Sequence, residues 1–213
     1  YVAITDNVDT LSNNNDIAPF KNILNDMYAK DLSRKIKIAK RQRAMNGYFI
    51  ASQAPYGYKQ DPTNKNKLII DPEAAQVVRK IFEMALDKKG STIIANTLMA
   101  ENIVNPATYK SINGDTRFDR YIKDDTFKRS GVWIPATINA ILKDRVYVGD
   151  MVNRKYEIEN YKTKKVVKVP IDQRIIVCGT HEAIISHEEF DEVQKILESR
   201  STKKVHDSEN YFK

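Results

Sequence analysis

Positive charge is concentrated in one short segment near the start of the chain. Residues 30–43 contain seven Lys or Arg residues and a single acid, Asp31. Steps of four, three and four residues place four of these cations on one face of a helix, and we call this set the basic stripe. The basic stripe consists of Lys30, Arg34, Lys37 and Arg41. Like charges in a row repel one another unless anions neutralise them, and the phosphates of duplex DNA are such anions. The alternative is an ordinary solvated helix face, which would carry mixed signs.

A second candidate for nucleic-acid contact is a short helix expected at residues 135–143. Its outward face is small and polar, and its inward face is apolar. The outward residues are Ala136, Asn139, Ala140 and Lys143, and the inward residues are Ile138, Ile141 and Leu142. An asparagine can pair with two atoms of adenine, a lysine can reach guanine or phosphate, and small side chains permit close approach to the base edges. The alternative is a generic helical domain whose polar face contacts only water.

No other group of residues indicates catalysis or metal binding. Cys178 and His181 have the spacing of half a zinc site, but a structural zinc site normally combines two such halves, and the second is missing. A buried thiol and surface histidines are the better interpretation. The sequence contains neither a G-x-x-x-x-G-K-[ST] phosphate-binding loop nor a G-x-S-x-G nucleophile elbow. We therefore expect no metal, no cofactor and no catalytic residue in this segment.

The elements that position these residues indicate an α+β fold. Hydrophobic spacing and capping residues predict a long connector helix from about residue 16 to residue 45, then a mainly helical, helix-turn-helix-like domain with small β-hairpins. The predicted helices of that domain are 72–88, 91–101, 135–143 and 187–200, and its predicted strands are 58–60, 67–70, 146–153 and 163–177. The polar, aperiodic residues 105–131 are expected to form a long loop. The first three helices have the order of a helix-turn-helix bundle.

These elements divide the chain into residues 1–46, residues 47–200 and a disordered tail at residues 201–213. Residues 1–5 alternate like one strand of a sheet whose other strands would come earlier in the chain. Because an isolated strand has nothing to pair with, we expect the chain to be part of a longer protein.

Composition narrows the class of protein. The formal net charge is +7, from 35 Lys and Arg against 28 Asp and Glu, which favours an anionic partner such as nucleic acid or anionic lipid. The sequence has no apolar run of about 18 residues and no basic-then-apolar leader, so neither a membrane span nor a secretion signal is expected. The single cysteine excludes an internal disulfide and suits a reducing cytoplasm, where we expect the protein to act.

Several segments, taken in order, resemble the large serine recombinases of mobile elements, among which are integrases and transposases. They are residues 4–10 (ITDNVDT), 16–20 (DIAPF), 25–36 (NDMYAKDLSRKI), 54–58 (APYGY), 70–75 (IDPEAA) followed by Val78, Ile81 and Phe82, then Ile94, Ala95 and Leu98, Trp133 with Thr137, Ile138, Ile141 and Leu142, Tyr147 with Gly149, and 179–186 (GTHEAIIS) with Phe190. The resemblance covers about residues 1–200. It implies the end of a resolvase-type catalytic domain with its long connecting helix, followed by the recombinase DNA-binding domain.

The resemblance also implies a mechanism. In this family a serine hydroxyl attacks a DNA phosphate to form a 5′-phosphoserine link, arginines stabilise the developing charge, and a tetramer rotates half of itself before religation. No metal or nucleotide cofactor takes part. The nucleophile segment comes before Tyr1 in the family, so the parent is expected to be an enzyme and this segment is not expected to cleave DNA alone.

By this resemblance, the partner is double-stranded DNA at recombination sites, bound by a parent that is a homodimer or homotetramer. The long helix would cross the minor groove, and the three-helix unit would read the major groove. The predicted DNA-binding residues are Lys30, Arg34, Lys37, Arg41, Tyr58, Thr137, Asn139, Lys143, Arg145, Arg154 and Lys155, and Trp133 is assigned to the core. Two alternatives remain: a non-enzymatic helix-turn-helix regulator, and a protein-interaction module that is merely basic.

Overall fold

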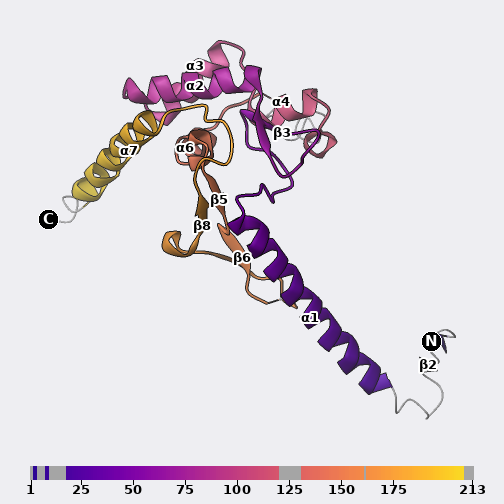
Figure 1. The fold of residues 1–213 in the computed structure, drawn as a ribbon. Helices are drawn as coiled ribbons and strands as arrows, with labels where there is room; N and C mark the ends of the chain where they lie inside the picture. Colours follow the sequence, from indigo (N-terminus) through magenta and orange to yellow (C-terminus); the bar gives the residue numbers. More distant parts are fainter. Residues whose placement is uncertain (1, 4–7, 10–17, 120–130, 161, 209–213) are drawn as a thin grey trace. The chain divides into compact units, whose positions relative to one another are not determined.

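The computed structural model describes residues 2–3, 8–9, 18–119, 131–160 and 162–208 (Figure 1). They belong to two compact units. Unit 1 comprises Tyr1–Asn46 and Asn153–Ile175, and unit 2 comprises Gly47–Val152 and Ile176–Lys213. Unit 1 therefore joins two stretches that are far apart in the sequence, which the local patterns did not predict.

Unit 1 is built on the long helix α1, Ala18–Met45, whose 28 residues span about 42 Å at 1.5 Å per residue. The helix ends at Met45, as predicted, and Gly47 has the left-handed φ of 72° typical of a residue just after a helix. Residue 16, where the helix was expected to start, lies outside the described residues. The large apolar side chains of α1 are exposed, among them Phe20, Leu24, Met27, Tyr28 and Ile36, whereas Ala44 near its end is buried.

Two small antiparallel pairs complete unit 1. Strand β1 (Val2–Ala3) pairs with β2 (Val8–Asp9), so a partner of the first strand lies later in this chain. Strand β6 (Tyr156–Ile158) pairs with β7 (Val166–Lys168), with Tyr156 opposite Lys168 and Ile158 opposite Val166. A short 3-10 helix, Ile171–Gln173, follows this hairpin.

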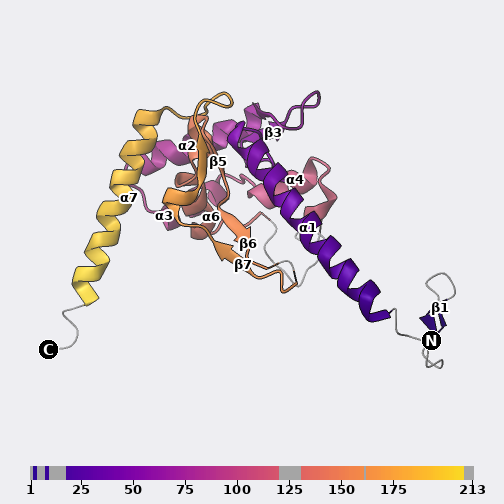
Figure 2. The same ribbon diagram turned by 60° about the horizontal axis from the view of Figure 1, so that its bottom comes forward.

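Unit 2 is mainly helical (Figure 2). Its elements are the hairpin β3 (Tyr58–Gln60) and β4 (Leu68–Ile70), then α2 (Pro72–Leu86), α3 (Ser91–Ala100), α4 (Pro106–Ile112), η1 (Thr116–Phe118), α6 (Pro135–Leu142), η3 (Arg145–Val148) and α7 (His187–Ser208). Strand β5 (Met151–Asn153) pairs with β8 (Ile175–Val177) in another two-stranded sheet. Long helices with small strand pairs confirm the predicted α+β fold.

The core of unit 2 forms where α2 packs on α3, α6 and α7, and where α3 packs on α6. Ile81, Phe82, Ile94, Leu98 and Ile138 are at most 1% exposed. Since burying one such side chain contributes about 1.5–3 kcal/mol, these contacts dominate the stability of the unit. Trp133 is also buried, and its Nε1 donates to the carbonyl of Ile103 at 2.8 Å, so its assignment to the core is confirmed.

Three expectations about unit 2 were wrong. Residues 105–131 are not one long loop, because α4 and η1 lie within them: the Asn105 side chain accepts from the Thr108 amide, and Pro106 occupies the first turn of α4. Residues 145–148 form a 3-10 turn rather than a strand, because Asp144 caps the Val146 amide. Helix α7 continues to Ser208, beyond the end expected at residue 200.

Gly149 ends that 3-10 turn with a φ of 84°, and a Cβ added there would lie 2.8 Å from the His181 carbonyl oxygen. We predict that Gly149→Ala lowers the free energy of unfolding by at least about 2 kcal/mol, because the left-handed backbone and the close carbonyl both oppose a side chain. Urea unfolding measures the change. Gly90→Ser is the control, since Gly90 caps α3 at a φ of −74° with no atom near a built Cβ, and it should leave stability unchanged or slightly raised. Equal stability of Gly149→Ala and the wild type would contradict the strain.

Candidate nucleic-acid interface

The basic stripe lies on the second half of α1, and all four of its side chains are exposed. The acids near the basic stripe neutralise some of its cations more than others. Asp31, the acid within the segment, forms an ion pair with Lys35 at 2.7 Å, and this hydrogen bond is the main reason why the pKa of Asp31 lies below its ordinary value. Lys30 and Arg34 thus present their charges to solvent on the side of α1 that the spacing predicted.

The β6–β7 hairpin is fastened to α1 at two points within unit 1. The Lys37 ammonium donates to the carbonyl of Ile158 at 2.7 Å, and Lys162 forms an ion pair with Asp26 at 2.9 Å. Glu157 of β6 is held by Arg154, whose Nη2 and Nε lie 2.7 and 3.1 Å from the Glu157 carboxylate.

The Glu157 carboxylate remains charged because it has cationic neighbours. The hydrogen bond from Arg154 is the largest cause that lowers the pKa of Glu157, and Lys37 and Arg41 lower it further. One carboxylate therefore offsets part of the charge at the end of the basic stripe near Lys37 and Arg41. An anionic ligand would find its least opposed cations at Lys30 and Arg34.

The two units differ in charge. Unit 2 contains 20 Lys and Arg and 20 Asp and Glu, whereas unit 1 contains 15 and 8 and so carries the whole formal net charge of +7. The surplus of Lys and Arg over Asp and Glu, which indicated an anionic partner, therefore lies in unit 1.

Helix α6 presents the outward face that was predicted from its sequence. Ala136, Ala140 and Lys143 are exposed, and Thr137 and Asn139 are half-buried. Its inward residues are the buried Ile138, Ile141 and Leu142, which confirms the predicted apolar face. Small side chains around an amide and an ammonium leave this face open to approach by a base edge.

The other predicted DNA-binding residues take part in local structure. Tyr58 is 4% exposed and its hydroxyl donates to the Glu182 carbonyl at 2.9 Å, while burial raises its pKa well above the ordinary value. Arg145 donates through Nε and Nη2 to the fully buried Asp150, at 3.1 and 2.7 Å. Arg154 is bound to Glu157 as described, and Lys155 is half-buried. We leave Tyr58, Arg145 and Arg154 out of the proposed interface, because burial or a carboxylate engages each of them.

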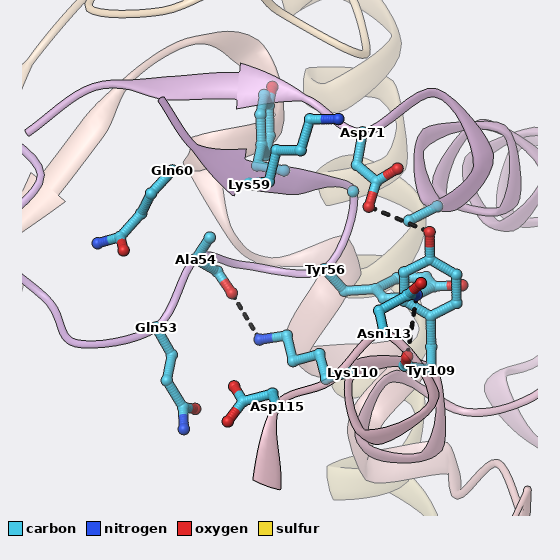
Figure 3. A pocket seen from close by; sticks show the side chains of 13 residues that line it. Gln53, Ala54, Tyr56, Lys59, Gln60, Asp71, Tyr109, Lys110, Asn113 and Asp115 are labelled. Atoms are coloured by element: carbon cyan, nitrogen blue, oxygen red, sulfur yellow. Dashed lines mark hydrogen bonds between the residues drawn. The ribbon is translucent and has the colours of Figure 1, made fainter. Parts of the chain in front are cut away.

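A pocket of about 200 Å³ lies in unit 2 between β3, the preceding extended segment and α4 (Figure 3). The Lys110 ammonium donates to the Ala54 carbonyl at 2.6 Å, and the Tyr109 hydroxyl donates to Asp71 at 3.1 Å. Arg117 of η1 donates to the Ser52 carbonyl at 3.2 Å. Burial lowers the pKa of Lys110, with Asp115 opposing that shift.

These contacts give α4 and η1 a role that the sequence patterns missed. Two cations hold the extended backbone of residues 52–54 by its carbonyl groups, so that segment is positioned from outside. The signal for α4 was the Asn105-Pro106 start, which the lack of periodicity in so short a helix obscured.

Within the described ranges, no group of three His, Cys, Asp or Glu side chains could hold a metal ion. Cys178 is an exposed free thiol, so its expected burial was wrong.

His181 lies 2.8 Å from the Val146 carbonyl through Nε2 and 2.7 Å from the Thr180 hydroxyl through Nδ1. In the neutral ring Nε2 must donate, because a carbonyl only accepts. None of the helices in the described part of the chain is long and apolar enough to cross a membrane.

The fold and these sites define an α+β protein with a basic helix-and-hairpin unit and a neutral, mainly helical unit. The family model described as Recombinase matches residues 72–200, which is more than half of the chain. The chain belongs to the recombinase family, and the family resemblance stated from its sequence motifs is confirmed.

Two solved structures are similar to part of the chain. One, described as "Crystal Structure of a LSR-DNA Complex", is 22% identical with a TM-score of 0.45, over 78% of this chain and 38% of that one. The other, described as "Sequence Requirements of the Listeria innocua prophage attP site", is 22% identical with a TM-score of 0.45, over 77% of this chain and 51% of that one. The chain thus spans about half or less of the length of either. None of the curated proteins compared with the chain matches it.

The environment of His181 predicts how stability depends on pH. Burial is the main cause that lowers the pKa of His181 below its ordinary 6.5, while the Val146 hydrogen bond and Asp150 oppose it. The unfolded chain therefore binds a proton near pH 6.5 that the folded chain holds less well, so the free energy of unfolding should fall as the pH drops below about 6.5. Urea unfolding at a series of pH values between about 5.5 and 7.5 measures this slope.

His181→Gln should flatten the slope, because it removes the titrating ring. His187→Gln, at an exposed position, should keep the wild-type slope. A His181→Gln variant whose stability falls with pH as steeply as that of the wild type would refute this origin of the pH dependence.

Proposed function

We propose that this chain is the DNA-binding portion of a site-specific serine recombinase of a mobile element, whose parent cuts and rejoins DNA through a 5′-phosphoserine intermediate. The observation that carries the DNA-binding part is the exposed basic stripe, in a unit that holds the whole net charge. The cutting chemistry rests on the family and on the sequence resemblance. No residue of this chain is assigned a catalytic role. In this proposal the chain binds DNA, and the longer parent protein, a homodimer or homotetramer, performs the reaction.

The proposed interface has two parts with different tasks. The basic stripe neutralises phosphates, which supplies affinity without sequence preference. The outward face of α6 reads base edges in the major groove, with Asn139 pairing to adenine and Lys143 reaching guanine or phosphate. Thr137 flanks Asn139 on this face and is a candidate for a further polar contact.

The first test concerns phosphate contact by the basic stripe. Each phosphate contact adds about 0.9 to the steepness with which log affinity falls as log salt rises. Lys30→Gln/Arg34→Gln should therefore make this fall shallower by up to about 1.8. Binding of a labelled duplex from an end of the parent element, measured by anisotropy between about 50 and 300 mM salt, gives the slope.

Lys89→Gln/Lys195→Gln is the matched control, because it also removes two charges from exposed lysines, both of them in unit 2. It should keep the wild-type slope. A wild-type chain whose binding hardly depends on salt would eliminate the DNA-binding proposal.

The second test concerns sequence reading by α6. Each base that Asn139 or Lys143 reads should contribute about 1–3 kcal/mol to the preference for the element-end duplex over a scrambled duplex, which is about 5-fold to 150-fold. Asn139→Ala/Lys143→Ala should remove that preference. The salt dependence of its duplex binding should differ from that of the wild type by at most the contribution of one phosphate contact, about 0.9 in the slope of log affinity against log salt, because only Lys143 of the two can neutralise a phosphate. Competition between the two duplexes at fixed salt measures the preference. A wild-type chain that binds both duplexes equally would show that α6 reads no sequence.

A further inference from the structure

The β6–β7 hairpin is a second concentration of positive charge. Residues 154–168 contain six Lys or Arg residues and two Glu, a net charge of +4. Residues 30–43 carry +6, so these two segments hold +10 of a chain whose total is +7, and the remainder is net negative by three. The excess positive charge of the protein therefore lies on α1 and on this hairpin.

The acids of the hairpin are already engaged. Glu157 faces Arg154, Lys37 and Arg41, and Glu159 forms an ion pair with Lys165 at 3.1 Å. Lys162 is engaged with Asp26. Lys164 and Lys168 are exposed cations at the turn and on β7.

Strand alternation separates the two faces of the hairpin. Glu157 and its partner Val167 lie on one face, whereas the pairs Tyr156–Lys168 and Ile158–Val166 lie on the other. Tyr156 is 65% exposed and Val166 is 61% exposed. The second face thus combines a lysine with exposed aromatic and aliphatic surface. Neither of the two residue pairs on that face contains an acid.

That face fits the backbone of duplex DNA. A lysine at its edge and another at the turn suit phosphates, and the tyrosine and aliphatic side chains suit the less polar sugars between phosphates. The hairpin is fastened to α1 by the Lys37 and Lys162 contacts, so it belongs to the same unit as the basic stripe.

We propose that the β6–β7 hairpin is a second phosphate-contacting element that binds the same duplex as the basic stripe, through Lys164 and Lys168. The proposal rests on the proposed function, and it assigns part of the salt-dependent affinity to a segment more than 100 residues after α1. Arg154 has a positioning role in it, because this side chain holds Glu157 on the face away from Lys168.

The test compares three double variants of the full chain that each remove two charges. Lys164→Gln/Lys168→Gln should lower the salt slope by up to about 1.8 and weaken duplex binding at least about tenfold at about 100 mM salt. Lys30→Gln/Arg34→Gln should lower the slope similarly, and Lys89→Gln/Lys195→Gln should leave it at the wild-type value. A hairpin variant that keeps the wild-type slope while the stripe variant loses it would overturn the hairpin proposal and leave the proposed function intact. A salt-independent wild type would overturn both.

Lysine acetylation of the wild-type chain, read by mass spectrometry with and without duplex, tests the proposal without any substitution. Lys164 and Lys168 should be protected by the duplex as strongly as Lys30, while Lys89 and Lys195 stay reactive. Equal reactivity of Lys164 and Lys168 in both samples, with Lys30 protected, would overturn the proposal.

Discussion

Repulsion among cations is the constraint on which the arrangement of unit 1 depends. Helix α1 and the β6–β7 hairpin are both strongly basic, yet they lie together in one compact unit. Acids placed between them make this possible: Asp26 binds Lys162, and Glu157 binds Arg154 beside Lys37 and Arg41. Exposed ion pairs contribute little net stability, so these contacts fix the hairpin's position more than they hold the unit together. Unit 1 has too few acids to neutralise its lysines and arginines, and the phosphates of a DNA backbone would supply the missing negative charge.

Unit 2 rests on a different force. Its charges balance, and its stability comes from apolar side chains of α2, α3, α6 and α7 that are removed from water. Its fully buried acid, Asp150, is compensated by Arg145, because an uncompensated buried charge is strongly destabilising. Arg145 was predicted as a DNA contact, whereas in the structure its guanidinium is paired with the carboxylate five residues later.

Local patterns predicted those elements whose start, stop and periodicity agree. Asp71-Pro72 and the apolar spacing placed α2 correctly at its first residue, and α3 and α6 ended within a residue of expectation. Helix α4 was missed because seven residues are too few to show a period. Strands β3 and β4 were predicted within one residue, whereas strands β5, β7 and β8 are much shorter than the strands expected at 146–153 and 163–177. The attachment of the hairpin to α1 joins residues 121 positions apart, and no local pattern specifies such a contact.

The candidate site was predictable to the same extent. Spacing identified the basic stripe and the outward face of α6, because both follow from the geometry of a single helix. Spacing could not show which of the predicted side chains are already engaged, since Tyr58, Arg145 and Arg154 contact partners that folding brings close.

The segregation of charge would divide the work of recognition between the units. A neutral unit 2 has no net Coulomb attraction to DNA, so the face of α6 gains little affinity from phosphates and must gain preference from base edges. In the proposed function, unit 1 binds any duplex, and because α6 is tethered to it, the effective concentration of that face at the DNA rises. Affinity then depends on salt and preference does not, because the contacts that set them lie in different units. This separation suits a protein that must stay on DNA while it distinguishes one short site from the surrounding sequence.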